Sequence, residues 1–340
     1  MAASRHNVSP ATDAIEFCYR QGWTDGLPVV PPTTEKVDAM IAAGAKSPQH
    51  ILGTIPERRR SATVEKVAVN AVMAGCLPEY FPVVSAAVEA MLADDFAAHG
   101  PTASTAGAGM LVIVHGPVAR RLGVNSGNNL FGPGARANAT IGRAVRLTLL
   151  NILGSVPGVT DMSTLGHPGK YTYCIAEDED NSPWTPFHVD QGFKPGDSAV
   201  TVIAAEGPRQ IGNHIATAPE PILTCIADHM AALGTGGFGQ GQYLAVIGRE
   251  HALTISEHGW GKEKVKEFLA RKAVRSLAAL KEAGIRPGRP APGDQFKLIP
   301  AARDAGDIYI LVGGGRAGRF SAICPFWSSK EVGRAVTRPV

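Results

Sequence analysis

Short apolar runs bounded by glycine are the feature that most constrains how this 340-residue chain can fold. The clearest are Leu111-Val-Ile-Val-His-Gly116 and Leu244-Ala-Val-Ile-Gly248. Continuous apolar runs of this length are typical of strands that are covered on both faces. Between them lie amphipathic stretches such as residues 140–153, in which apolar side chains recur at helical spacing. The sequence therefore predicts an α/β or α+β fold and leaves the strand order open.

The order of the predicted elements repeats along the chain. The first set comprises helices over residues 64–73, 78–93 and 140–153 and strands over 110–115, 171–176 and 199–205. The second comprises helices over residues 220–233 and 262–275 and strands over 243–247, 295–299 and 307–312. This repetition predicts an internal duplication that gives two similar α/β lobes with a ligand-binding cleft between them. The expected division is an N-terminal wrapping arm (1–60), a first lobe (61–212) and a second lobe (213–340).

Composition excludes several classes of protein. The chain is 44% hydrophobic and 19% charged, which indicates a folded protein, and its net charge is only +3. The one tight basic cluster, Arg58-Arg59-Arg60, has no interleaved aromatic residues, so we expect no nucleic-acid partner. No run approaches the roughly 18 apolar residues of a membrane span. The five cysteines are far apart and form no C-x-x-C pair, which favours a reducing cytoplasm.

Cys76 is the first candidate for chemistry. It precedes Pro78 and Glu79, residues that suit the first turn of a helix. Free N–H groups and the positive end of the helix dipole would then face the sulfur and lower the pKa of the thiol. A buried structural cysteine is the alternative. If Cys76 is a nucleophile, we expect Glu79 or a histidine, His115 or His188, to move the proton.

A loop rich in asparagine and glycine is the candidate substrate-binding site. It runs from Gly123 to Thr140, between a predicted buried strand and a predicted helix capped by Asn138 or Thr140. Such a helix start offers N–H donors to an anion, and arginines add charge-assisted hydrogen bonds. The alternative is an ordered turn whose amides bond their own backbone. The residues assigned to substrate binding are Asn125, Ser126, Asn128, Asn129, Arg136, Asn138, Thr140 and Arg143.

Two glycine patterns resemble dinucleotide fingerprints without the context that such a site needs. Gly313-Gly-Gly315-Arg-Ala-Gly318 follows a predicted strand, but too few residues remain for a βαβ unit. The run at residues 234–239 follows a helix and precedes a strand, which is the wrong order. No P-loop occurs. Both runs could line a pocket, and Arg316 is added to the substrate-binding candidates.

Metal binding is a further alternative. His188-Val-Asp190 on a strand would project both side chains to one face, where zinc or iron could bind. The acidic run Glu177-Asp-Glu-Asp180 lacks the spacing of an EF-hand and is interpreted as a solvated loop. The preferred interpretation assigns neither a metal ligand nor a cofactor.

Several segments are similar to a bacterial family associated with the UGSC (selenocysteine or cysteine) thiol-redox motif. They are Trp23-Thr-Asp-Gly-Leu-Pro-Val-Val-Pro-Pro-Thr33, the Cys76 segment, the loop from Asn125 to Arg143, and Gly169-Lys-Tyr-Thr. The resemblance covers most of the chain and implies little about activity. The chain also contains no Cys-Gly-Ser-Cys segment, so Cys76 is the remaining candidate thiol of that resemblance.

The preferred hypothesis is a cytoplasmic, cysteine-dependent hydrolase or lyase that acts on a small, anionic molecule. The thiolate of Cys76 would attack the substrate, and the asparagine-rich loop would stabilise the developing negative charge. Two alternatives stay open: a non-catalytic ligand-binding protein or partner subunit of a thiol-redox system, and a metalloenzyme that uses His188 and Asp190. A homodimer is expected because the proline-rich arm suits wrapping around a neighbour.

Overall fold

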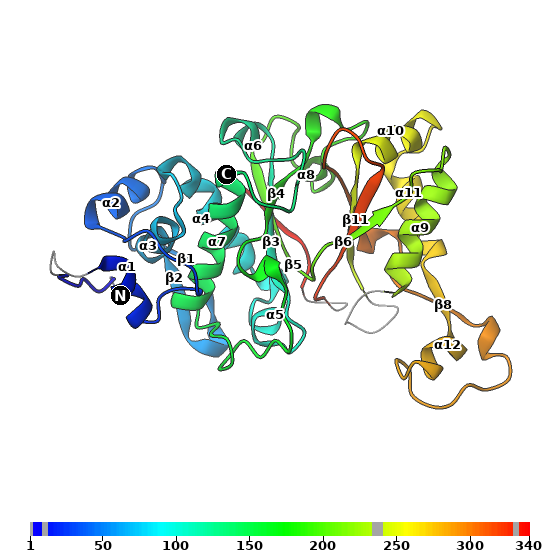
Figure 1. The fold of residues 1–340 in the computed structure, drawn as a ribbon, viewed down its shortest axis with the longest axis horizontal. Helices are drawn as coiled ribbons and strands as arrows, with labels where there is room; N and C mark the ends of the chain where they lie inside the picture. Colours follow the sequence, from blue (N-terminus) through cyan, green and yellow to red (C-terminus); the bar gives the residue numbers. More distant parts are fainter. Residues whose placement is uncertain (1–2, 9–12, 233–240, 329–332) are drawn as a thin grey trace.

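Two four-stranded sheets pack face to face, and helices cover the outer face of each, so the protein is an α/β fold in four layers (Figure 1). A computed structural model describes residues 3–8, 13–232, 241–328 and 333–340. The glycine-rich run at residues 234–239 lies outside the described residues. No helix among the described residues is long and apolar enough to span a membrane.

The first sheet has the order β12-β5-β3-β4. Its members are β12 (Val336–Pro339), β5 (Ala199–Ala205), β3 (Gly109–His115) and β4 (Cys174–Ala176). β3 and β4 are parallel, and the other neighbours are antiparallel. Helices α4 (Phe81–Met91) and α7 (Arg136–Asn151) cover its outer face, and α3 (Val64–Ala74) packs on both helices.

The second sheet has the order β10-β7-β11-β6. Its members are β10 (Ile308–Val312), β7 (Tyr243–Ile247), β11 (Phe320–Pro325) and β6 (Arg209–Gly212). β10 and β7 are parallel, and β11 is antiparallel to both of its neighbours. Helices α9 (Pro219–Ala232), α10 (Arg249–Glu257) and α11 (Lys262–Lys272) pack against it on the outer face.

The two sheets share one pattern of order and direction, and each receives one strand from the other half of the chain. After β5 the chain crosses to the second sheet as β6, and after β11 it returns to the first sheet as β12. The predicted boundary at residues 212 and 213 therefore divides the chain differently from the sheets. By position in the sheets, β4 corresponds to β10 and β5 to β11. The order of the predicted elements instead pairs residues 307–312, which form β10, with β5. The duplication itself stays a prediction.

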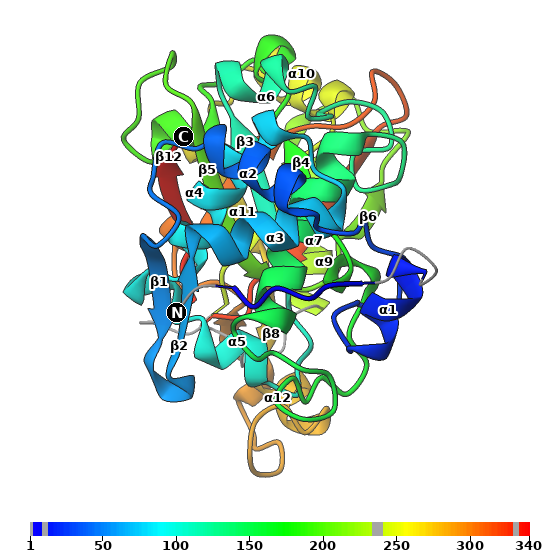
Figure 2. The ribbon, with the colours of Figure 1, turned by 90° about the vertical axis from the view of Figure 1, so that its left-hand side faces the viewer.

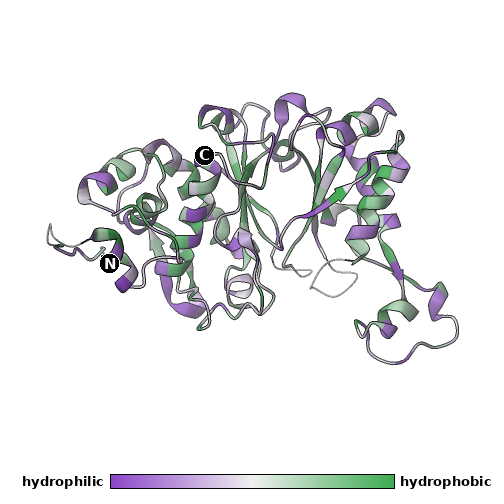
Figure 3. Ribbon diagram, in the orientation of Figure 1, coloured by the Kyte–Doolittle hydropathy of each residue, from purple (hydrophilic) through white to green (hydrophobic). Residues whose placement is uncertain are grey.

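Alternating side chains divide the core between the two faces of each sheet. In β3, Val112 and Val114 face the helices, whereas Leu111 and Ile113 face the second sheet. All seven residues of β3 are buried, as predicted for a strand that is covered on both faces. The strands of both sheets are correspondingly hydrophobic in Figure 3. Any polar side chain at the end of β3 or β4 therefore points to one of two distinct environments.

The N-terminal segment packs on the first sheet's helices. Helix α1 (Ala14–Arg20) is capped by Asp13, and α2 (Thr34–Ala42) is capped by Thr33. α2 packs against α3 (Figure 2), and the hairpin of β1 (Ile51–Ile55) and β2 (Arg60–Thr63) follows. The segment thus packs on helices of its own chain, and its role as a wrapping arm stays a prediction. Contact with a second copy stays a prediction, as does the homodimer.

The remaining helices and strands are short. They are α5 (His99–Ala103), α6 (Pro117–Arg121), α8 (Phe187–Asp190), β8 (Val274–Ser276), α12 (Leu277–Glu282) and β9 (Leu298–Pro300). Single 3-10 turns complete the chain: η1 (Pro56–Arg58), η2 (Pro78–Tyr80), η3 (Asp94–Phe96), η4 (Pro168–Lys170), η5 (Glu179–Asn181), η6 (Asp294–Phe296) and η7 (Ala305–Asp307). β8 and β9 pair as a small antiparallel sheet, and α12, which lies between them in the chain, projects from the body (Figure 1).

Candidate metal centre

Two histidines and two glutamates converge at the carboxyl ends of the parallel strands β3 and β4. His115 is the last residue of β3, and Glu177 directly follows β4. Glu179 lies in η5, and His188 lies in α8. One ligand atom of each of these four residues lies within 4.8 Å of the other three. We call His115, Glu177, Glu179 and His188 the His/Glu cluster.

Burial of the His/Glu cluster is nearly complete. The side chains of His115, Glu177 and His188 are 0% exposed, and that of Glu179 is 9% exposed. His115 lies on the face of β3 that meets the second sheet, and its ring stacks on Phe187 with 5.3 Å between centroids. The only solvent-reachable member of the cluster is therefore Glu179, whose carboxylate meets the half-exposed Arg120 at 3.5 Å.

Both histidines are held on the side away from the cluster. His188 Nε2 lies 3.2 Å from the carbonyl oxygen of Lys194, and His115 Nε2 lies 2.9 Å from Thr201 Oγ1. A carbonyl can only accept, so His188 Nε2 carries a proton, and it is the neutral form of this ring that presents a lone pair at Nδ1. Metal-binding histidines in proteins are usually oriented in this way.

The two carboxylates are positioned by backbone donors. Phe187 N donates to Glu177 Oε2 at 2.7 Å, and Gly116 N donates to Glu179 Oε1 at 2.7 Å. Gly116 has a φ of +73°, and a side chain there would collide with the carbonyl oxygen of Asp197. The turn after β3 thus requires glycine, and this turn aims an N–H group at Glu179.

Three atoms of the His/Glu cluster have no hydrogen-bond partner. They are His115 Nδ1, His188 Nδ1 and Glu177 Oε1, all buried. His115 Nδ1 lies 3.7 Å from Glu177 Oε2, and His188 Nδ1 lies 3.5 Å from Glu179 Oε1. Ligand atoms at roughly 2.0–2.2 Å from one zinc ion are about 3.3–3.6 Å apart at the corners of a tetrahedron. No hydrogen bond bridges either separation, and that between His115 and Glu177 is close to the spacing of two ligands of one metal ion.

Electrostatics also separates this cluster from an ordinary ion pair. Burial lowers the pKa of His115 to about 3, and the neighbouring His188 acts in the same direction. Burial raises the pKa of Glu177 to about 7, against the opposing effect of the Lys262 ammonium. His115 is therefore a neutral imidazole at physiological pH, which is the form that binds a metal ion.

The prediction that His188 and Asp190 share one face of a strand is wrong. Residues 187–190 form helix α8 instead of a strand, so the two side chains do not share a face. Asp190 accepts a hydrogen bond from Lys262 Nζ at 2.6 Å and lies outside the cluster. The carboxylates come instead from Glu177 and Glu179, which the sequence analysis assigned to a solvated loop. That interpretation is wrong for Glu177 and Glu179, whose side chains β4 and η5 carry inward, whereas Asp180 is exposed.

Cys76 lies on the opposite face of the same sheet. It packs among the helix-facing residues with Val112 and Val114 and is 8% exposed. Burial raises the pKa of its thiol to about 12, whereas the sequence analysis predicted a lowered value. The prediction is wrong because Cys76 ends the preceding helix: Gly75 adopts φ +89°, and Cys76 N bonds to Ala71 O. The thiol thus sits at the negative end of α3.

The residues expected around Cys76 are only partly brought together. Cys76 Sγ donates to the carbonyl oxygen of Thr140 at 3.3 Å, and Arg136 binds the carbonyl oxygen of Gly75. Glu79 lies exposed in η2. His115 and His188 lie beyond the sheet, because His115 faces the second sheet and Cys76 faces the helices. The predicted proton transfer between a histidine and Cys76 has no geometric basis here.

The asparagines of the Gly123–Thr140 loop mostly bond their own backbone. Asn138 Oδ1 accepts from Asn125 N, and its Nδ2 donates to the carbonyl oxygens of Asn125 and Cys174. Asn125 Oδ1 accepts from Gly127 N, and Asn129 Nδ2 donates to Pro133 O. The predicted cap at Asn138 or Thr140 is wrong, because α7 begins at Arg136. The loop therefore has the structure that the alternative interpretation predicted.

Four further substrate-binding candidates are dispersed. Arg143 forms a bidentate pair with Asp25 in the N-terminal segment, with N–O distances of 2.9 and 2.7 Å. The carbonyl oxygen of Ser126 accepts a hydrogen bond from Gly314 N, so the asparagine-rich loop and the 313–318 glycine run lie side by side. The side chains of Asn128 and Arg316 are exposed on these loops.

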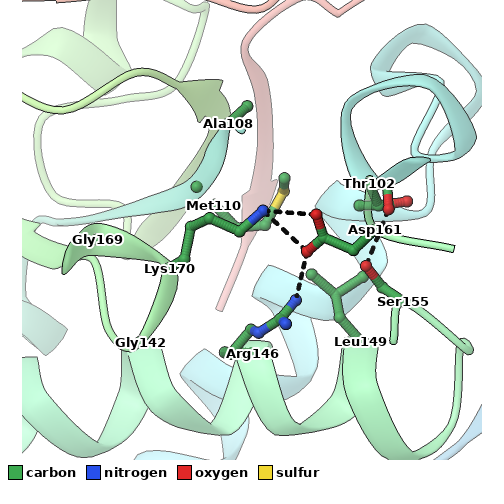
Figure 4. A pocket seen from close by; sticks show the side chains of 11 residues that line it. Thr102, Ala108, Met110, Gly142, Arg146, Leu149, Ser155, Asp161, Gly169 and Lys170 are labelled. Atoms are coloured by element: carbon green, nitrogen blue, oxygen red, sulfur yellow. Dashed lines mark hydrogen bonds and ion pairs between the residues drawn. The ribbon is translucent and has the colours of Figure 1, made fainter. Parts of the chain in front are cut away.

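A second polar cluster is closed by its own ion pairs. Asp161 Oδ2 forms ion pairs with Arg146 Nη1 at 3.4 Å and with Lys170 Nζ at 2.8 Å (Figure 4). The cavity beside them measures about 10 Å³, which is room for a single water molecule. With its charges already paired, this cluster serves to fix the loop after α7.

A larger cavity, of about 620 Å³, lies between the N-terminal residues and helices α2 and α3. Its volume suits a small ligand. However, Asn151 at its edge already donates to Asn70 Oδ1 and to the carbonyl oxygen of Trp23. Among the described residues, no buried side-chain atom without a partner lines this cavity. It therefore lacks the unpaired polar groups that distinguish the His/Glu cluster.

Comparison with known proteins gives no match to a family model and none to a curated protein. The resemblance to the UGSC-associated family stays a prediction.

Proposed function

We propose that this protein is a metal-dependent enzyme whose metal centre is the His/Glu cluster. The observation that carries the proposal is the convergence of four ligand residues in which three buried atoms, His115 Nδ1, His188 Nδ1 and Glu177 Oε1, have no hydrogen-bond partner. Leaving a buried polar atom unpaired costs about 1–3 kcal/mol. Three such atoms within one cluster of residues call for a partner, and a cation bound by His115, His188 and Glu177 would supply it.

The donor set selects the class of metal. Two imidazoles and carboxylate oxygens, without sulfur, suit Zn²⁺, Fe²⁺ or Mn²⁺. Two histidines and one glutamate are also the protein ligands of one type of catalytic zinc site, in which a water molecule takes the fourth position. Such an ion makes its bound water acidic and polarises a carbonyl of the substrate.

Glu179 has a different role from Glu177 in this proposal. Its carboxylate already accepts a hydrogen bond from Gly116 N and faces Arg120. It is also the most exposed member of the cluster. It is therefore placed to accept a proton from the attacking water as a general base. The proposed chemistry is hydrolysis or a lyase reaction on a small molecule that approaches past Glu179 and Arg120. Cys76 takes no part in it.

Metal stoichiometry tests this proposal. Protein stripped with a chelator and reloaded should bind one Zn²⁺ per chain, measured by elemental analysis and by competition with a chromophoric chelator. We expect His115→Ala, His188→Ala and Glu177→Gln each to weaken Zn²⁺ binding more than 100-fold, because each removes a ligand. His251→Gln is the matched control, since His251 is a buried histidine outside the cluster that bonds to Ser321 and Asn213.

The outcome for Glu179 separates its two roles. Glu179→Gln should keep Zn²⁺ binding within about tenfold of the wild type, because the three ligands remain. A loss as large as that of Glu177→Gln would make Glu179 a fourth ligand and contradict its role as a base. Wild-type protein that binds no Zn²⁺, Fe²⁺ or Mn²⁺ stoichiometrically would refute the proposal.

A further inference from the structure

Two threonines from two strands hold the rear of the His115 ring. Thr201 lies in β5 and is 0% exposed, and its hydroxyl is 2.9 Å from His115 Nε2. Thr337 lies opposite it on the edge strand β12, and the two hydroxyl oxygens are 2.9 Å apart. His115, Thr201 and Thr337 thus form a hydrogen-bonded chain that ends on the strand returning from the second sheet.

This chain can run in two directions with the same number of protons. In one, His115 Nε2 donates to Thr201, and Thr201 donates to Thr337, which leaves a lone pair on Nδ1. In the other, Thr337 donates to Thr201, and Thr201 donates to Nε2, which puts the ring proton on Nδ1. That proton would face Glu177 Oε2 at 3.7 Å. Only the first direction presents a metal ligand.

His188 has no such freedom. The carbonyl oxygen of Lys194 can only accept, so the backbone alone fixes the tautomer of His188. A hydroxyl can donate or accept. The tautomer of His115 therefore depends on side chains that can be changed without altering the cluster itself.

We propose that Thr201 and Thr337 are positioning residues that hold His115 in the tautomer with a free Nδ1. The inference rests on the proposed metal centre and adds to it the dependence on β12. The strand that crosses over from the second sheet would thereby complete the rear support of a ligand in the first. Partners of this kind typically change metal affinity 10–100-fold.

Zn²⁺ affinity of matched variants tests the inference. Thr201→Val removes the hydroxyl at nearly constant shape and should weaken Zn²⁺ binding 10–100-fold. Thr201→Ser keeps the hydroxyl and should bind within about threefold of the wild type. Thr337→Val leaves Thr201 able to accept from the ring, so its loss should be smaller than that of Thr201→Val. This variant lies on a half-exposed edge strand, so it also serves if Thr201→Val does not fold.

Histidine nitrogen shifts supply a readout that a purely structural role would not move. In selectively ¹⁵N-labelled, Zn²⁺-loaded protein, His115 should carry its proton on Nε2. In metal-free Thr201→Val we expect the ring of His115 to populate the Nδ1–H tautomer, while the ring of His188 stays unchanged. If the wild type binds Zn²⁺ and Thr201→Val has the same Zn²⁺ affinity and the same His115 tautomer, the positioning role of Thr201 and Thr337 is refuted. If the wild type binds no metal, it is the metal centre that fails.

Discussion

The two faces of the first sheet carry the two candidate sites, and they differ in whether their buried polar atoms have hydrogen-bond partners. On the helix-facing side, the thiol of Cys76 donates to Thr140 and is surrounded by aliphatic side chains. On the side that faces the second sheet, His115 and Glu177 keep buried atoms without partners. Both sites are almost fully buried. Burial therefore does not distinguish a functional site from the core, whereas unpaired polar atoms that converge do.

Thiol reactivity gives the largest expected effect. Because a pKa of about 12 lies three units above the ordinary value of 9.0 for a cysteine, native Cys76 should hold about 1000-fold less thiolate at neutral pH than in the unfolded chain. Its alkylation by iodoacetamide should keep rising with pH beyond pH 10. Peptide mass spectrometry of native and urea-unfolded protein measures both rates, with the less buried Cys225 as an internal control. Rapid native labelling that levels off near pH 8.5 would restore Cys76 as a nucleophile.

A glycine substitution tests the turn that serves the His/Glu cluster. Gly116→Ala should destabilise the protein by about 3 kcal/mol, because the new Cβ meets the carbonyl oxygen of Asp197 and φ is positive. Gly123→Ala is the matched control: its φ is +65°, but its surroundings are open, so about 1 kcal/mol is expected. Urea unfolding of both variants gives the difference. Equal losses would mean that the turn after β3 is not constrained by Asp197.

An arginine on the helix-facing side tests whether its polar residues are structural. Arg143→Ala should destabilise the chain by about 2 kcal/mol, because it breaks the bidentate pair with the buried Asp25. Glu263→Ala breaks a pair in which the glutamate is 77% exposed and should cost less than about 0.5 kcal/mol. Thermal unfolding measures both. An unchanged stability for Arg143→Ala would reopen its assignment to substrate binding.

The smallest expected effect concerns Cys76 and metal binding. Cys76→Ser should leave Zn²⁺ affinity within about twofold of the wild type, because the sheet separates residue 76 from the His/Glu cluster. Competition with a chromophoric chelator measures the affinity. A loss of tenfold or more would show that the two faces are coupled.

Local patterns predicted most of the fold, and long-range pairing supplied the rest. The apolar runs at 110–115, 199–205 and 243–247 became strands because burial on both faces needs only local composition. The central strand β11 escaped the sequence analysis, since it is short, follows a glycine run and ends at Pro325. The crossing of β6 and β12 between sheets has no local signal at all.

The candidate sites show the same limit. The sequence pattern at Cys76 predicts a cysteine at the start of the helix that follows Pro78. The positive φ of Gly75 shows instead that Cys76 lies at the end of the preceding helix. His115 and His188 were identified as chemical candidates, but Glu177 and Glu179 were missed because an acidic run is usually solvated. One signal was present: His115 and Glu177 each directly follow a run of apolar residues. Pairing of the two strands in parallel places His115 and Glu177 together, but no local sequence pattern predicts which strands pair.

X-ray absorption of the Zn²⁺-loaded protein tests the central claim most directly, because it identifies the atoms bound to the ion. The account predicts nitrogen and oxygen ligands at about 2.0–2.1 Å, with the multiple-scattering pattern of two imidazoles, and the same spectrum for Cys76→Ser. A sulfur ligand at about 2.3 Å, or a shell without imidazole, would contradict it.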